Sequence, residues 1–238
     1  MKGRMKKTLI LVGLLSCGVI GAFAQGVLIW IARPNWDISF YSPSTATPSV
    51  IQTGNSPQDA PPGTTTYTGG WIGDTSTSPG PGVGPTPASF EGVNYQNAAN
   101  FEVGLYVDTT AAAVLTDIQT LSPLAIDGIE DGGLYGISRP GTAPGIPPGT
   151  FVNVGLAAWY TDGGLYGSYA AAVDAQQAAG YNISANQLAL GSLFGTPVFI
   201  GPGLGLTSFS LATTVPEPGT IGLGPIGAAA FLLRLRRR

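Results

Sequence analysis

The stretch that decides the fold is "FEVGLYV", residues 101–107. Its apolar side chains alternate strictly and fall on one face: Phe101, Val103, Leu105 and Val107. This period of two is typical of a half-buried β-strand. A second stretch, "TFVNVGLAAWY" (residues 150–160), is rich in β-branched and aromatic residues and predicts another long strand.

Shorter segments on either side fit the same architecture. Strands are predicted within residues 27–32, 36–41, 67–72 and 206–213. "AAAVLTDIQTL" (residues 111–121) fits a helix or a strand, and the turn at residues 108–110 before it favours a strand. Only residues 168–180 predict a helix, because they are Ala-rich and end at Gly180, where a cap belongs.

Short strands separated by Gly/Pro turns predict an all-β fold, an antiparallel β-sandwich or a jelly-roll-like ectodomain. The chain has 238 residues, of which 36 are Gly and 20 are Pro. We therefore expect one folded domain with long, poorly structured loops, the longest being the Pro/Gly/Thr-rich stretch 42–87.

Charge is strongly segregated along the chain. The ten basic and 13 acidic residues give a formal charge of −3. Eight of the basic residues lie in the first seven or the last five positions, and only Arg33 and Arg139 lie between. Residues 25–214 carry those two arginines and 12 carboxylates, a formal charge of −10. Such a body cannot neutralise a phosphate backbone, which excludes nucleic-acid binding.

The residue types needed for several chemistries are missing. The sequence has no histidine, which excludes Ser-His-Asp and Cys-His catalysis and zinc sites that use histidine. Its one cysteine, Cys17, lies in the N-terminal apolar run, so the body has no thiol or disulfide. We expect no cofactor.

The N-terminal segment, residues 1–24, has the three regions of a secretory signal peptide. Four basic residues precede an apolar run at residues 9–20, which predicts an N-terminal signal helix. Ala22 and Ala24 then form an A-x-A site before Gln25, which predicts cleavage by signal peptidase. A retained membrane helix and lipoprotein processing at Cys17 are the alternatives.

The C-terminal segment, residues 215–238, contains three consecutive features. They are the step Val215, Pro216, Glu217 and Pro218, the uncharged stretch 219–233, and the basic cluster Arg234, Arg236, Arg237 and Arg238. As a helix the uncharged stretch would be about 22 Å long, short of the ~30 Å hydrocarbon core, and Pro225 interrupts it. The arginines would stay cytoplasmic and leave the body outside. The pattern predicts a short C-terminal membrane helix that serves as a temporary tether.

This tripartite tail resembles the PEP-CTERM sorting signal. The resemblance covers residues 215–238, and Gly219 departs from the Ser or Ala that usually follows the Pro-Glu-Pro step. It implies that an exosortase, an integral-membrane transpeptidase or protease, processes the tail near Pro218. It also implies a destination at the cell surface or in an exopolysaccharide matrix. Residues 149–175 are also similar, through less specific motifs, to the bodies of some PEP-CTERM proteins.

Two sets of residues are candidates for ligand binding in the body. "DGGLYG" occurs at residues 131–136 and 162–167, and both copies suit turns. The alternative is a pair of loops that presents Tyr135 and Tyr166 to a sugar. The acidic cluster Asp127, Glu130 and Asp131 is a weak calcium candidate, and solvated turn carboxylates are the other interpretation.

These observations predict a non-enzymatic exported protein with a structural or adhesive role in an exopolysaccharide or biofilm matrix. Signal peptidase and exosortase are the expected partners, and an extracellular polysaccharide is a further candidate. A carbohydrate-binding module and a surface glycan-active enzyme are the alternatives. The second would need two of the 12 carboxylates to converge.

Overall fold

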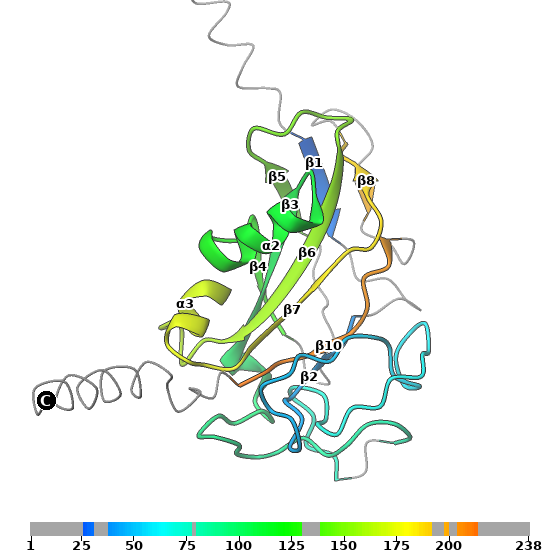
Figure 1. Cartoon of the computed structure of the whole chain (residues 1–238). Helices are drawn as coiled ribbons and strands as arrows, with labels where there is room; N and C mark the ends of the chain where they lie inside the picture. The colour runs from blue at the N-terminus through cyan, green and yellow to red at the C-terminus, as the bar shows by residue number, and fades with distance from the viewer. Residues whose placement is uncertain are drawn as a thin grey trace, which may run out of the picture.

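The computed structural model describes residues 26–30, 38–77, 80–129, 139–191, 198–199 and 204–213 (Figure 1). Its centre is an antiparallel pair of long strands, β3 (Phe101–Asp108) and β6 (Phe151–Tyr160). They pair along the whole of β3, from Phe101 opposite Tyr160 to Asp108 opposite Asn153. The two strands that the sequence predicts most clearly are therefore confirmed.

Short strands extend this pair into a five-stranded sheet. β4 (Ala125–Gly128) pairs with β3, while β7 (Ala179–Ile183) and β8 (Leu188–Ala189) both pair with β6. Every pairing in this sheet is antiparallel. The expectation of a mostly antiparallel β architecture is confirmed.

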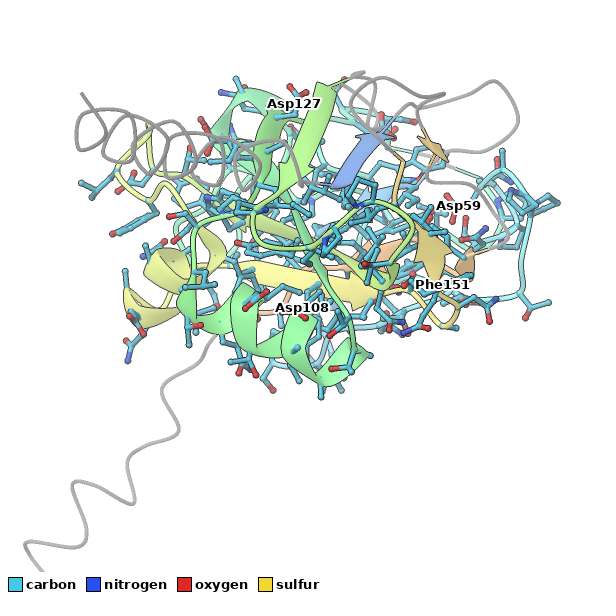
Figure 2. The ribbon with its side chains drawn as sticks, turned by 90° about the horizontal axis from the view of Figure 1, so that it is seen from above. Asp59, Asp108, Asp127 and Phe151 are labelled. Atoms are coloured by element: carbon cyan, nitrogen blue, oxygen red, sulfur yellow. The ribbon has the colours of Figure 1, made fainter. Side chains whose placement is uncertain are left out.

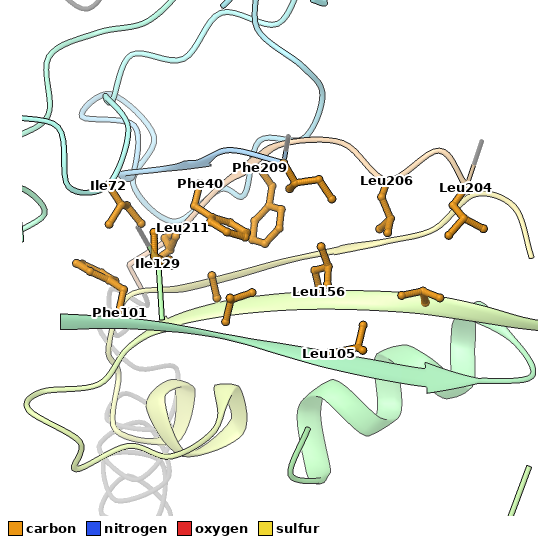
Figure 3. Close-up of a cluster of buried hydrophobic side chains, with 14 of the residues drawn as sticks. Phe40, Ile72, Phe101, Leu105, Ile129, Leu156, Leu204, Leu206, Phe209 and Leu211 are labelled. Carbon is orange, nitrogen blue, oxygen red and sulfur yellow. The ribbon is translucent and has the colours of Figure 1, made fainter. Parts of the chain in front are cut away.

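The main core lies on one face of this sheet (Figure 3). Side chains of β3 and β6, among them Phe101, Leu105 and Leu156, face a layer that contains Phe40 and Phe209. These two rings meet edge to face with centroids 5.1 Å apart. They belong to β2 (Phe40–Tyr41) and β10 (Phe209–Ser210), which pair in parallel. Burial of each large side chain contributes about 1.5–3 kcal/mol, so this layer is a large part of the fold's stability.

Two helices cover the opposite face of the sheet (Figures 1 and 3). They are α2 (Ala111–Thr120) and α3 (Tyr169–Asp174). Gly155 of β6 leaves room for α2, because a Cβ there would lie 2.5 Å from Val114 Cγ1 and 2.9 Å from Ile118 Cδ1. Both α2 side chains are fully buried. The molecule therefore has three layers, with helices, the sheet, and a layer of short strands and irregular chain.

The remaining described elements are short. A second sheet has the order β5-β1-β9, in which β1 pairs antiparallel with β5 and in parallel with β9. The bounds are β1 (Gly26–Trp30), β5 (Arg139–Ala143), β9 (Val198–Phe199) and the 3₁₀ turn η2 (Ala98–Asn100). β1 confirms the strand predicted within residues 27–32.

The strand prediction for residues 111–121 is wrong, because residues 111–120 form α2. Thr110 caps the helix, since its Oγ1 accepts a hydrogen bond from the Ala113 N–H at 3.1 Å. Val114 and Ile118 are four residues apart and both face the sheet. The capping threonine and this spacing favour the helix over the strand that the preceding turn suggested.

Three other predictions were right about position and wrong about length. The helix expected at residues 168–180 ends at Asp174, and Gly180 lies inside β7. A Cβ at Gly180 would lie 2.5 Å from the Ser210 carbonyl oxygen, so this glycine permits close backbone approach and caps no helix. Of residues 36–41 and 206–213, only Phe40–Tyr41 and Phe209–Ser210 form strands within the described ranges.

The described residues of the stretch 42–87 are irregular, as expected, but they are not poorly structured. Tyr67, Ile72 and Val83 are buried, and isolated bridges join Tyr67 to Val83 and Tyr41 to Trp71. The strand predicted within residues 67–72 is reduced to these bridges. Hydrogen bonds therefore hold the stretch without regular strands.

Candidate functional site

Most residues that the sequence marks as functional lie outside the described residues. These are Ala22, Ala24, Gln25, Glu130, Asp131, Tyr135, Val215, Pro216, Glu217, Pro218, Arg234, Arg236, Arg237 and Arg238. Asp127 and Tyr166 are the two that the structure places.

Asp127 lies on β4 opposite Val103 and is 6 % exposed. Its Oδ1 accepts a hydrogen bond from the Gly128 N–H at 3.0 Å. Among the described residues, no three His, Cys, Asp or Glu side chains come together as a metal site would require. Figure 2 shows Asp59, Asp108 and Asp127 in separate parts of the molecule. Calcium binding at Asp127 with Glu130 and Asp131 stays a prediction.

Tyr166 lies in the turn that follows β6, in the second "DGGLYG" copy. Its side chain is half-buried against the apolar cluster between the sheet and its two helices, and its carbonyl accepts a hydrogen bond from Trp159 Nε1–H at 2.8 Å. Leu165, a large apolar side chain of the same turn, is 68 % exposed. Trp159 itself is fully buried, which makes it a core residue and no platform for a sugar. A sugar contact by Tyr166 stays a prediction.

A pocket of about 260 Å³ lies between the two helices. Gln119 of α2 lines it together with Tyr169, Ala170, Val173 and Asp174 of α3. Burial raises the pKa of Tyr169 to about 12, with the neighbouring Tyr181 as a smaller cause, so the hydroxyl stays protonated at neutral pH. The pocket thus offers an amide, a phenol and a carboxylate beside two apolar side chains.

Sequence reasoning missed this pocket, because Gln119 joins Tyr169 and Asp174 only if residues 111–120 are helical. The capping Thr110 and the spacing of Val114 and Ile118 were the signals that could have found it.

A buried polar network crosses the irregular stretch. Asp59 is 5 % exposed, and its Oδ1 accepts the Tyr41 hydroxyl at 2.7 Å while its Oδ2 accepts the Ser56 N–H at 2.6 Å. The Tyr41 ring stacks on the Tyr67 ring with centroids 3.7 Å apart. Burial raises the pKa of Tyr41 and of Tyr67 well above the ordinary value. The polar groups of this network bond to one another, so we assign it to the stability of this stretch.

Two partly buried carboxyl groups meet where β3 gives way to α2. Burial raises the pKa of Asp117 above its ordinary value, and the charge and hydrogen bonding of Asp108 raise it further. Asp108 Oδ1 also accepts a hydrogen bond from the Thr109 hydroxyl at 3.0 Å. Because the raised pKa belongs to the folded chain, protonation of Asp117 favours the folded state at acid pH.

The described chain ends in backbone pairing at residues 212–213. Ala212 exchanges two hydrogen bonds with Ala179, at 2.8 and 3.0 Å, and the Thr213 N–H donates to the Pro48 carbonyl at 2.7 Å. Val215 follows shortly after in the sequence. The body is thus joined by hydrogen bonds up to a point just before the Pro-Glu-Pro step.

Within the ranges that the structure describes, no helix is both long and apolar enough to cross a membrane. Comparison of the chain with protein-family models, with curated proteins and with solved structures found no match.

Proposed function

We propose that this chain is an exported protein of the cell surface or extracellular matrix that an exosortase sorts through its C-terminal tail. The basic and apolar N-terminal region supports export, with cleavage after Ala24. The tripartite tail supports sorting through Val215–Pro218 and the terminal arginines. Before processing, the apolar stretch 219–233 tethers the chain to the inner membrane.

The strongest structural support for the proposal is the position at which the hydrogen-bonded body ends, just before the tail. Ala212 and Thr213 hold the last paired backbone groups that the structure describes, and the Pro-Glu-Pro step begins at Pro216. Cleavage near Pro218 would leave those hydrogen bonds intact. Proline disfavours helix at its own position and at the residue before it, so we expect this step to be extended, which suits recognition by an enzyme in the membrane.

The role of the body in this proposal is structural or adhesive rather than catalytic. In finer detail, we propose an antiparallel β-sandwich or jelly-roll-like ectodomain between the signal helix and a short C-terminal membrane helix. The β2–β10 pair, packed over the sheet face that bears the main core, supports a second layer of strands. The formal charge of −10 over residues 25–214 is compatible with a hydrated extracellular polymer.

The experiment is replacement of the four terminal arginines by alanine in the full chain, expressed in a bacterium that has an exosortase. We expect the wild-type chain at the outer surface in shortened form, and the variant at full tail length in the membrane fraction. Arg139→Ala is the matched control, because it removes a positive charge from the body. Export and shortening of the tail variant at the wild-type level would overturn the proposal.

A further inference from the structure

The pocket between α2 and α3 is lined by residues of the body, and the sorting proposal uses none of them. Both helices cover the same face of the sheet and contact each other (Figure 1). Gln119 contributes from the last turn of α2, and Tyr169, Ala170, Val173 and Asp174 contribute from α3. Its volume of about 260 Å³ is just below the ~300 Å³ at which common ligand pockets begin. Such a space fits a ligand about the size of one sugar ring.

The polar side chains of this pocket are not engaged by the other residues that the structure describes. Within the described part of the chain, the side chains of Gln119, Tyr169 and Asp174 form no hydrogen bond or ion pair with another residue. Tyr169 is held in place by its edge-to-face contact with Tyr181, at 5.8 Å between centroids. The pocket therefore combines a fixed phenol with an amide and a carboxylate that are available to a ligand.

The hydrogen-bond donors and acceptors of these three side chains indicate which class of ligand the pocket can bind. The Gln119 amide both donates and accepts, the protonated Tyr169 hydroxyl does the same, and the Asp174 carboxylate accepts. Ala170 and Val173 supply apolar surface between them. A ligand hydroxyl also donates and accepts, so neighbouring hydroxyls on one ring can satisfy all three groups. We propose that this pocket binds a neutral sugar ring.

Ions of either sign fit less well. The formal charge of −10 over residues 25–214 repels an anionic ligand. An ammonium group only donates hydrogen bonds, so it would leave the Gln119 N–H groups unused. It would depend on Asp174, which is exposed, and an exposed ion pair contributes little to binding. The complement of donors and acceptors thus favours an uncharged polyol.

The test is saturation-transfer NMR on the purified full chain, kept in a detergent without a sugar headgroup. The neutral probes are glucose, galactose, mannose, xylose and N-acetylglucosamine. Glucuronate is the anionic probe, and methylammonium is the cationic probe. We expect at least one neutral sugar to bind, with affinity unchanged by moderate salt. We expect neither charged probe to bind.

Variants locate the site. Gln119→Ala and Asp174→Ala should each weaken sugar binding about fivefold, the effect of losing one hydrogen bond. Ala170→Leu should abolish binding by filling the pocket. Thr120→Ala is the matched control on α2, and it should bind like the wild type. Gln119 and Asp174 are exposed, so thermal unfolding should confirm that their variants remain folded.

Three results would overturn the inference. They are binding of none of the neutral sugars, binding that survives Ala170→Leu, and binding of methylammonium alone with loss in salt. None of these bears on processing of the tail, so failure here leaves the sorting proposal standing.

Discussion

Asp59 shows how a single buried carboxylate can hold an irregular segment. It lies in a stretch without long strands, yet it is 5 % exposed and accepts hydrogen bonds from Tyr41 and Ser56. A buried charge is tolerated only when such partners are present. The Tyr41 hydroxyl joins this carboxylate to β2, and its ring stacks on Tyr67. Removal of one hydroxyl should therefore weaken the whole stretch.

Tyr41→Phe should lower the free energy of unfolding by about 1.5–3 kcal/mol, the range for a lost hydrogen bond to a charged group. The measurement is urea-induced unfolding followed by tryptophan fluorescence. Tyr160→Phe is the matched control, because its hydroxyl is 3.3 Å from Asp162 in an exposed position, and it should change stability by less than about 0.5 kcal/mol. Equal effects of the two variants would show that Asp59 does not depend on Tyr41.

Asp117 predicts a pH dependence with a definite sign. The folded state raises its pKa above the ordinary 3.8, so the folded chain holds this proton more tightly than the unfolded chain. The resulting stabilisation is complete below about pH 3.8 and is lost as the pH rises through the raised pKa. At pH 7 the ionised Asp117 therefore makes the folded state less stable than a neutral side chain at this position would.

Asp117→Asn should raise stability at pH 7 by less than about 1 kcal/mol, because solvent screens this partly exposed group. The gain should disappear near pH 3, where the wild-type carboxyl is protonated. Urea unfolding at both pH values measures it. In an Asp108→Asn background the gain should shrink, since the neighbouring charge is gone. A loss of stability at pH 7 would contradict the assigned environment of Asp117.

At the scale of elements, strict alternation was a reliable guide and the short segments were not. Phe101–Val107 alternates because one face packs against the main core and the other against helices, and β3 was predicted accordingly. Residues 111–120 were misassigned because an Ala-rich segment after a turn also fits a hairpin. β2 and β10 have two residues each and lie near opposite ends of the body in the sequence. They pair in parallel, with Phe40 opposite Phe209 and Tyr41 opposite Ser210. No local pattern encodes that pairing.

Gly155 tests the packing of α2 on the sheet. Gly155→Ala should lower the free energy of unfolding by about 1–3 kcal/mol, because its methyl group would lie 2.5 Å from Val114 Cγ1. Gly128→Ala is the matched control in β4, since a Cβ there meets nothing within 4 Å. Thermal unfolding followed by circular dichroism measures both. Adding Val114→Ala should cost less in the Gly155→Ala background than alone, and additive effects would contradict the contact.

At the scale of the whole molecule, the function expected from the sequence depends on the two ends, and the fold depends on the body between them. The sorting hypothesis could be drawn from the tail because it depends only on the order and spacing of features along the sequence. The α2–α3 pocket could not be predicted in this way, because Gln119 and Asp174 are far apart in the sequence and meet only through tertiary packing. Tyr166, which the sequence proposes as a sugar-binding residue of the body, is half-buried, and the neighbouring Leu165 is exposed.

The most direct test of the central claim is the intact mass of the protein released from the outer surface of cells that express the full chain. Processing at both ends predicts a mass that corresponds to a chain starting at Gln25 and ending near Pro218, with any attached group added there. Recovery of a surface chain that still ends at Arg238 would contradict exosortase sorting.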